Sequence, residues 1–259
     1  MLIRDKFAEM TSFRPLLDQD PGFVESITSN CRVLIIEGIS GSGKDTFQKY
    51  LKKKLKDRDV YDFSEGEVLH SWKQLQIEGI LELRIKFMNC FVNYVKDIVS
   101  RDQNAVFLLN RFHLSTYAST IIQQPKLASG YEEIINVLRM LPVHIFILQL
   151  DENEIGERSL HPERSGAWQK FQQQIVGKNG FRGRLEKQQR LILEAAKRQQ
   201  IPYSIIKVSY ELEAGGGQVR ISEAPSIVRR AADPRISRAK RHLPPNFVER
   251  VTKRLVQSK

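Results

Sequence analysis

The strongest chemical signal in the sequence is the segment GISGSGK at residues 38–44. It follows an apolar run and precedes apolar residues at helical spacing, the setting of a phosphate-binding loop. Glycines let several backbone N–H groups point at one anion, and the following helix adds the positive end of its dipole. Lys44 would bridge the terminal phosphates; the alternative is a glycine-rich turn that binds nothing. The residues expected to bind a nucleotide are Gly38, Ser40, Gly41, Ser42, Gly43, Lys44, Asp45 and Thr46.

The position after the lysine departs from the usual loop. Asp45 stands where Ser or Thr normally places a hydroxyl on Mg²⁺, and the buried strand that should end in an acidic metal partner ends in Asn110. We hypothesise an exchange, in which Asp45 supplies the metal-facing charge that Asn110 lacks. Two alternatives stay open: Asp45 only favours the helix N-terminus while Mg²⁺ is held through water, or catalysis is impaired.

Alternating strands and helices must position this loop. Short apolar runs predict strands, of which the last is 203–209; the others are 33–38, 60–63, 105–110 and 144–150. Apolar residues at helical spacing predict helices after the loop and at 80–99, 114–123, 131–141 and 185–199. This alternation favours an α/β fold with a doubly wound, mainly parallel sheet of five strands.

These segments resemble the thymidylate kinase and deoxynucleoside kinase group of P-loop NTPases. The stretch EGISGSGKDT at 37–46 is similar to that group's EGxxGxGKST loop, and Asn110-Arg111-Phe112 is similar to its Asp-Arg-aromatic motif. Leu150-Asp151 and Arg158 lie where those kinases begin an arginine-bearing lid, here about 156–180. The resemblance implies a nucleotide kinase-like fold with a helical lid. It also implies transfer of the γ-phosphoryl group of ATP, with Mg²⁺, to a nucleoside or nucleotide.

Phosphoryl transfer needs alignment of two substrates and positive charge near the transferring oxygens. Arg111 follows a buried strand, at the sheet edge where ligands of open α/β folds bind; a surface charge or a pair with Glu37 or Glu65 is the alternative. Arg158 and Arg164 could close on the phosphates or could be solvated loop residues. The residues expected to act in catalysis are Lys44, Arg111, Glu65, Arg158 and Arg164.

Glu65 bears on the identity of the acceptor. A carboxylate can act as general base for a hydroxyl, whereas a nucleotide acceptor offers an anionic oxygen and needs no base. In the nucleoside kinases that the chain resembles, the corresponding carboxylate accepts the 5′-hydroxyl proton. The alternative is that Glu65 or Glu67 only forms a turn. Because the helix at 87–94 lacks the arginine that thymidylate kinases use near the base, the sequence does not name the acceptor.

The chain of 259 residues carries a formal net charge of +11, which favours an anionic ligand or partner. Residues 231–259 hold eight Lys or Arg against two acids and so supply +6. We expect an N-terminal extension at 1–30, a kinase domain at 31–230 and a basic tail at 231–259. Since the tail could hold nucleic acid or dock a partner, two alternative functions stay open. These are a polynucleotide-end kinase and a nucleotide-binding regulatory module with weakened turnover.

Charged residues interrupt the N-terminus, MLIRDKFAEM, where a signal peptide needs an apolar stretch, and no window is apolar enough to span a bilayer. Cys31 and Cys90 lie in apolar-periodic segments and are expected to be buried structural thiols in a reducing compartment. We expect a cytoplasmic protein without membrane contact. A homodimer is compatible with the sequence, which does not fix the oligomeric state.

Overall fold

The fold is built on a parallel sheet in a computed structural model that describes residues 21–64, 67–68, 78–156, 180–211, 218–220 and 223–224. Its five main strands follow the order β2-β3-β1-β4-β5, and all neighbouring pairs are parallel. Every residue of β1 and β3 is buried, as their unbroken apolar runs predict for strands covered on both faces. The bounds are β1 Val33–Gly38, β2 Asp59–Phe63, β3 Ala105–Asn110, β4 Val143–Leu150 and β5 Tyr203–Glu211.

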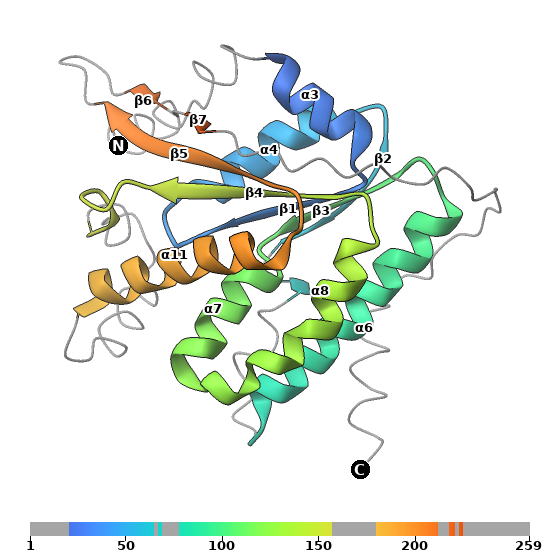
Figure 1. The fold of residues 1–259 in the computed structure, drawn as a ribbon. Coiled ribbons are helices and arrows are strands. Elements are labelled where there is room, and N and C mark those ends of the chain that lie inside the picture. Colours follow the sequence, from blue (N-terminus) through green and yellow to red (C-terminus); the bar gives the residue numbers. More distant parts are fainter. Residues whose placement is uncertain are drawn as a thin grey trace, which may run out of the picture.

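Helices cover both faces of this sheet. In Figure 1, α3 and α4 lie on one face, and α6, α7, α8 and α11 lie on the other. The predicted fold class is therefore confirmed: the chain has an α/β fold with a parallel sheet of five main strands, and the glycine-rich loop lies between β1 and α4. The bounds are α3 Pro21–Asn30, α4 Lys44–Lys54, α6 Ile80–Arg101, α7 His113–Gln123, the 3₁₀ helix η2 Pro125–Tyr131, α8 Glu132–Arg139 and α11 Gly180–Gln199.

The prediction that β5 is the last strand was wrong. Two short strands, β6 (Gln218–Arg220) and β7 (Glu223–Ala224), follow it and pair antiparallel with β5. They use the hydrogen-bonding edge that β5 would otherwise expose. Segments of two and three residues are too short to show a period in the sequence, so nothing in the pattern indicated them.

Helix α3 joins the core although it precedes the predicted kinase domain. Its Val24 is fully buried in the same apolar cluster as β1, and Glu25 forms an ion pair with Lys54 of α4 at 2.6 Å. Pro21 begins the helix, a position that proline tolerates because the first N–H of a helix has no intrahelical acceptor. The described part of the predicted extension is therefore packed against the sheet.

The two cysteines differ. Cys31 is partly buried, and burial raises the pKa of its thiol to about 11, which fits an inert structural thiol. The prediction that Cys90 is buried was wrong, because its side chain is exposed. On α6 the residues facing the core include Phe87, Met88 and Phe91, and Cys90 points away from that stripe.

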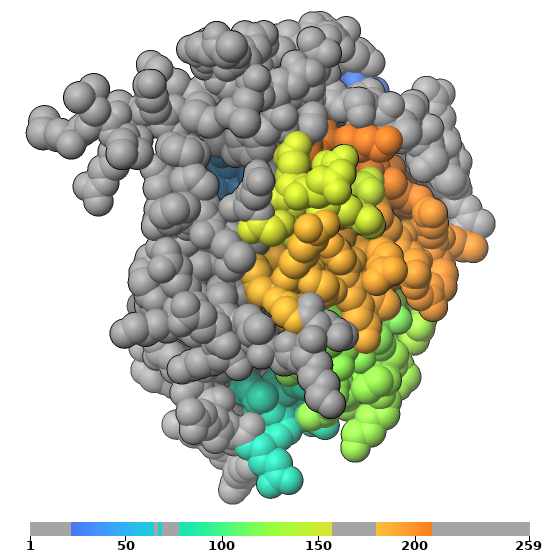
Figure 2. Space-filling model, turned by 90° about the vertical axis from the view of Figure 1, so that its left-hand side faces the viewer, coloured from blue at the N-terminus to red at the C-terminus, as the bar shows by residue number. Residues whose placement is uncertain are grey.

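The Gln189 side chain of α11 is hydrogen-bonded to the backbone at the end of β4. The Gln189 amide donates to the Leu150 carbonyl at 2.9 Å and accepts from the Leu150 N–H at 3.0 Å. Gln188 also donates to Ser119 of α7 at 3.1 Å. Figure 2 shows α11 in orange between the yellow segment that follows β4 and α7 in green. No helix in the described part of the chain has the length and apolar character needed to cross a membrane.

Two buried histidines make stability depend on pH. Burial lowers the pKa of both His113 and His144 to about 4, from an ordinary value of 6.5. Below pH 6.5 the unfolded chain therefore takes up protons that the folded chain does not, so the free energy of unfolding falls as pH drops toward 4. The expected slope is about 1.4 kcal/mol per pH unit for each histidine.

Urea unfolding of the wild type and of His144→Gln between pH 7 and pH 5 tests this prediction. Glutamine keeps a polar end near Ser204, to which the His144 ring is hydrogen-bonded at 2.9 Å, but it does not titrate. The variant should lose about half of the acid-dependent slope, because His113 is still present. Parallel pH profiles for the two proteins would contradict it.

Candidate functional site

The glycines of the loop are required by its backbone. Gly38 ends β1 with φ 146°, and a Cβ there would lie 2.6 Å from the Leu148 carbonyl oxygen of β4. Gly41 and Gly43 also have positive φ, 88° and 81°. Helix α4 begins directly after Gly43, whose carbonyl accepts from the N–H groups of the first turn. The loop therefore curls at the N-terminus of a helix, as an anion site requires.

Lys44 lies across this loop. Its Nζ donates to the Ile39 carbonyl oxygen at 2.7 Å and lies 3.5 Å from the Ser42 Oγ, and the residue is only 7% exposed. The ammonium group is thus held beside the loop backbone at the positive end of α4. A phosphate bound in the loop would meet both its N–H groups and this cation.

Asp45 and Asn110, which the sequence assigns to the metal site, are in direct contact. Asn110 Nδ2 donates to Asp45 Oδ1 at 2.6 Å and to Gln48 Oε1 at 2.8 Å. Asp45 is exposed at the mouth of the site, whereas Asn110 is only 3% exposed at the end of β3. Asp45, after the lysine, is therefore the acceptor, and Asn110, at the strand end, is the donor. In the usual loop the roles are reversed, because a hydroxyl residue after the lysine faces an acid at the strand end.

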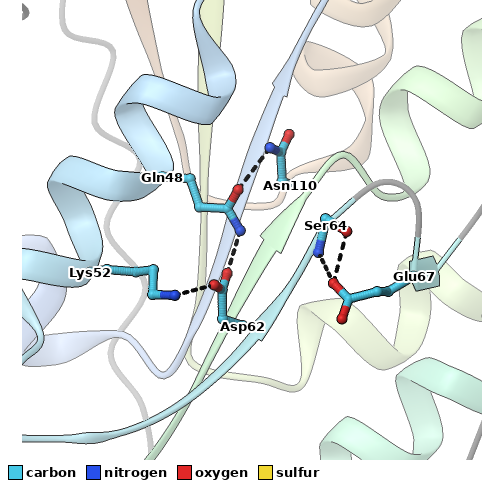
Figure 3. Close-up of polar contacts among 6 residues, drawn as sticks. All are labelled: Gln48, Lys52, Asp62, Ser64, Glu67 and Asn110. Atoms are coloured by element: carbon cyan, nitrogen blue, oxygen red, sulfur yellow. Dashed lines mark hydrogen bonds and ion pairs between the residues drawn. The ribbon is translucent and has the colours of Figure 1, made fainter.

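The hydrogen bonds continue from Asn110 through Gln48 to residues farther from the loop. Gln48 Nε2 donates to Asp62 Oδ1 of β2, and Lys52 Nζ pairs with Asp62 Oδ2 at 2.5 Å. Figure 3 shows this row of side chains crossing from α4 to β2 and β3. Sequence reasoning missed Gln48 and Asp62. A polar, buried residue inside the apolar stripe of α4 was the signal that could have revealed Gln48.

Glu37, the residue before Gly38, joins β1 to α7. Its carboxylate accepts from the backbone N–H groups of Phe112 and Leu114, both at 3.0 Å, and from Ser115 through N–H at 3.2 Å and Oγ at 2.5 Å. It is fully buried, and burial raises the pKa of this carboxyl, while the four hydrogen bonds oppose the rise. Glu37 thus caps the N-terminus of α7 rather than pairing with Arg111 as one alternative held.

Arg111 connects β3 to α7 in an unfavourable backbone conformation. Its N–H donates to the Ile36 carbonyl at 2.9 Å, and its φ is 61°, in the left-handed region that non-glycine residues rarely adopt. The side chain is half-buried at the carboxyl edge of the sheet, beside the loop. Backbone strain of this kind persists where surrounding contacts enforce it and is common at functional sites.

The catalytic candidates Glu65, Arg158 and Arg164, and nearly all of the predicted lid at 156–180, lie outside the described residues. Glu67 forms a turn with Ser64: its Oε2 accepts from the Ser64 N–H at 2.7 Å and Oγ at 2.8 Å (Figure 3). Phe112 is fully buried against Phe91, with ring centroids 5.7 Å apart, so it belongs to the core. Among the described residues there is no cluster of three or more His, Cys, Asp or Glu side chains that could hold a metal by itself.

No protein-family model matches the chain, and no curated protein matches it. Solved structures that are similar include thymidylate kinase from Ehrlichia chaffeensis, at 18% identity and TM-score 0.46 over 71% of this chain and 91% of that one. Thymidylate kinase from Candida albicans is 18% identical, with TM-score 0.46 over 69% and 84%. Deoxyadenosine kinase from M. mycoides is 14% identical, with TM-score 0.41 over 67% and 88%.

The Glu37 cap predicts a selective loss of stability in Ser115→Ala. The variant removes one of four donors from a buried carboxylate, so the free energy of unfolding should fall by roughly 1.5–3 kcal/mol. Ser119→Ala on the same helix is the matched control, because Ser119 Oγ accepts only from the neutral Gln188 amide. Urea unfolding of both variants measures the difference; equal losses would show that Glu37 has no special role.

Proposed function

We propose that the protein is an ATP-dependent kinase that transfers the γ-phosphoryl group to a nucleoside or nucleotide. The observation that carries this proposal is the position of Lys44. Its ammonium group is held across a glycine loop, at the N-terminus of α4 and at the carboxyl edge of a parallel sheet, where ligands of open α/β folds bind. Loop N–H groups and Lys44 would hold the donor phosphates.

The residues beside the loop fit Mg²⁺. Asp45 offers an exposed carboxylate, one oxygen of which accepts from Asn110, and the Thr46 hydroxyl is the next oxygen along the helix. Mg²⁺ prefers oxygen ligands and is commonly bound through one or two carboxylates together with substrate phosphates, so a larger cluster of acids is not needed. When bound, Mg²⁺ would neutralise part of the phosphate charge during transfer.

We propose Arg111 as the second cation near the transferring group, because it follows β3 at the same edge of the sheet as the loop. A guanidinium can hold two phosphate oxygens, and the Arg111 backbone is fixed by β1 on one side and by the cap of α7 on the other. Glu65 stays a predicted base for a hydroxyl acceptor, and Arg158 and Arg164 stay predicted lid cations. The basic residues of 231–259 stay a predicted contact for nucleic acid or for a partner.

Purified protein, ATP and Mg²⁺ with a panel of nucleosides, nucleoside monophosphates and oligonucleotides test the function. We expect ADP formation that depends on one class of small acceptor. Lys44→Ala should lower kcat/KM for ATP by about 10²–10³-fold, since a cation on the transferring phosphates is lost. Lys49→Ala, an exposed lysine on the same helix, should change it less than about twofold.

Two outcomes would contradict the proposed acceptor class. Transfer only to oligonucleotide ends would favour the polynucleotide-end kinase. Tight ATP binding without transfer to any acceptor would favour the regulatory module.

The positive φ of Arg111 predicts that stability and activity respond differently to two substitutions. Arg111→Ala keeps the strained backbone, whereas Arg111→Gly relieves it, so the glycine variant should be more stable by about 1 kcal/mol. Both remove the guanidinium, and both should lower kcat by about 10²–10³-fold. Urea unfolding and initial rates measure the two effects. If the alanine variant were as stable as the glycine variant, the strain at Arg111 would be refuted; if either kept full kcat, its role in transfer would be.

A further inference from the structure

One row of hydrogen-bonded side chains runs from the loop to the edge of the sheet. It consists of Asp45 and Gln48 from α4, Asn110 from β3 and Asp62 from β2. Figure 3 shows the last three of these residues. We call these four residues the polar relay. Lys52 adds an ion pair at its outer end, 2.5 Å from Asp62. Because two of the four are amides, each link constrains the next.

The two ends of an amide are alike in size, so its hydrogen-bond partners decide which way round it lies. The Asp62 carboxylate only accepts, and therefore Gln48 must turn its NH₂ group toward β2. The Gln48 oxygen then faces Asn110, which must turn its own NH₂ group toward α4. That same NH₂ group reaches Asp45 at 2.6 Å.

The polar relay explains why an acid, Asp45, follows the loop lysine and an amide, Asn110, ends β3. An acid at position 110 would place a carboxylate oxygen against Gln48 Oε1, and Gln48 cannot turn round without placing that oxygen against Asp62. A neutral donor at 110 satisfies both neighbours. The negative charge then has to come from the α4 side, and it does so at Asp45, whose second oxygen is left for a ligand at the exposed mouth of the site.

We propose that Asp62, acting through Gln48, sets the donor–acceptor polarity of the Asp45–Asn110 pair. Gln48 and Asp62 are then positioning residues for the cation that accompanies the triphosphate. This inference rests on the proposed function, because it assumes that Asp45 faces a nucleotide-bound cation. It goes further in naming two residues outside the loop that decide which side of the Asp45–Asn110 pair carries the charge.

A set of charge-exchange variants tests the polarity. The double variant Asp45→Ser/Asn110→Asp restores a hydroxyl on α4 and an acid on β3 but leaves Gln48 between two carboxylates. Adding Asp62→Asn lets the new amide donate to Gln48, so that Gln48 can turn round and donate to the acid. The triple variant should therefore melt about 3–8 °C above the double variant in the absence of nucleotide and metal.

Asp59→Asn in the same double background is the matched control. Asp59 lies on the same strand, bonds to Asn104 and has no hydrogen bond to Gln48, yet its substitution makes the same change of charge. This control should not raise the melting temperature of the double variant. Equal melting temperatures for the triple variant and this control would overturn the polarity argument.

Nucleotide binding gives the second readout. The ratio of ATP dissociation constants without and with Mg²⁺ reports how strongly the site holds the cation. The double variant should lose about tenfold or more of this Mg²⁺ effect, and the triple variant should regain most of it. An unchanged Mg²⁺ effect in the double variant, with ATP still bound and phosphoryl transfer intact, would overturn the inference and leave the proposed kinase standing.

A measurement on the wild type does not depend on how the variants fold. Both Asn110 NH₂ protons should exchange with solvent more slowly than those of the exposed Asn153, with signals assigned by their loss in Asn110→Asp. Exchange as fast as that of Asn153 would show that Asn110 is not held as a donor, and the relay would be wrong. A wild type that binds no ATP would overturn the proposed function and, with it, the cation that the relay serves.

Discussion

The parallel pairing of β1 with β3 decides where every polar residue of the site lies. Ile36 is in register with Asn110, and the ladder continues as Arg111 donates to the Ile36 carbonyl. Because the two strands end together, the loop after β1 and the turn after β3 meet at one edge of the sheet. This register brings Asp45 into contact with Asn110, although the two residues are 65 positions apart in sequence.

Glu37 of β1 holds the start of α7 against the same edge of the sheet. A buried carboxylate costs desolvation free energy, and here three backbone N–H groups and one hydroxyl of the first turn of α7 compensate for it. The cap fixes α7 directly after the strained Arg111, so the unfavourable φ is enforced from both ends. The strained backbone of Arg111 lowers the stability of the fold, and the hydrogen bonds of Glu37 at the N-terminus of α7 offset this cost.

The sequence could predict what depends on local pattern, namely five strands, the helices between them and the glycine loop. The position of Gln48 in the apolar stripe of α4 was visible, but its partners were not, since Asp62 and Asn110 are 14 and 62 positions away. Glu37 was visible only as a charge near Arg111, and its true acceptors, the backbone groups 75 to 78 positions on, have no residue-type signature. Cys90 was misplaced because its neighbours on α6 are apolar, although helical geometry turns it outward.

The position of Asp62 has a consequence for how such a site could change. Strand β2 is the edge of the parallel sheet, next only to β3, and Asp62 is itself partly exposed. A substitution there disturbs little packing, yet the orientation of the Gln48 amide carries its effect from Asp62 to Asn110. The charge at Asp45 and the acceptor at Asp62 are thus coupled, because an acid at position 110 would leave two oxygens face to face as long as Asp62 stays an acid. An acid after the loop lysine therefore fits this chain because an acid also stands on β2.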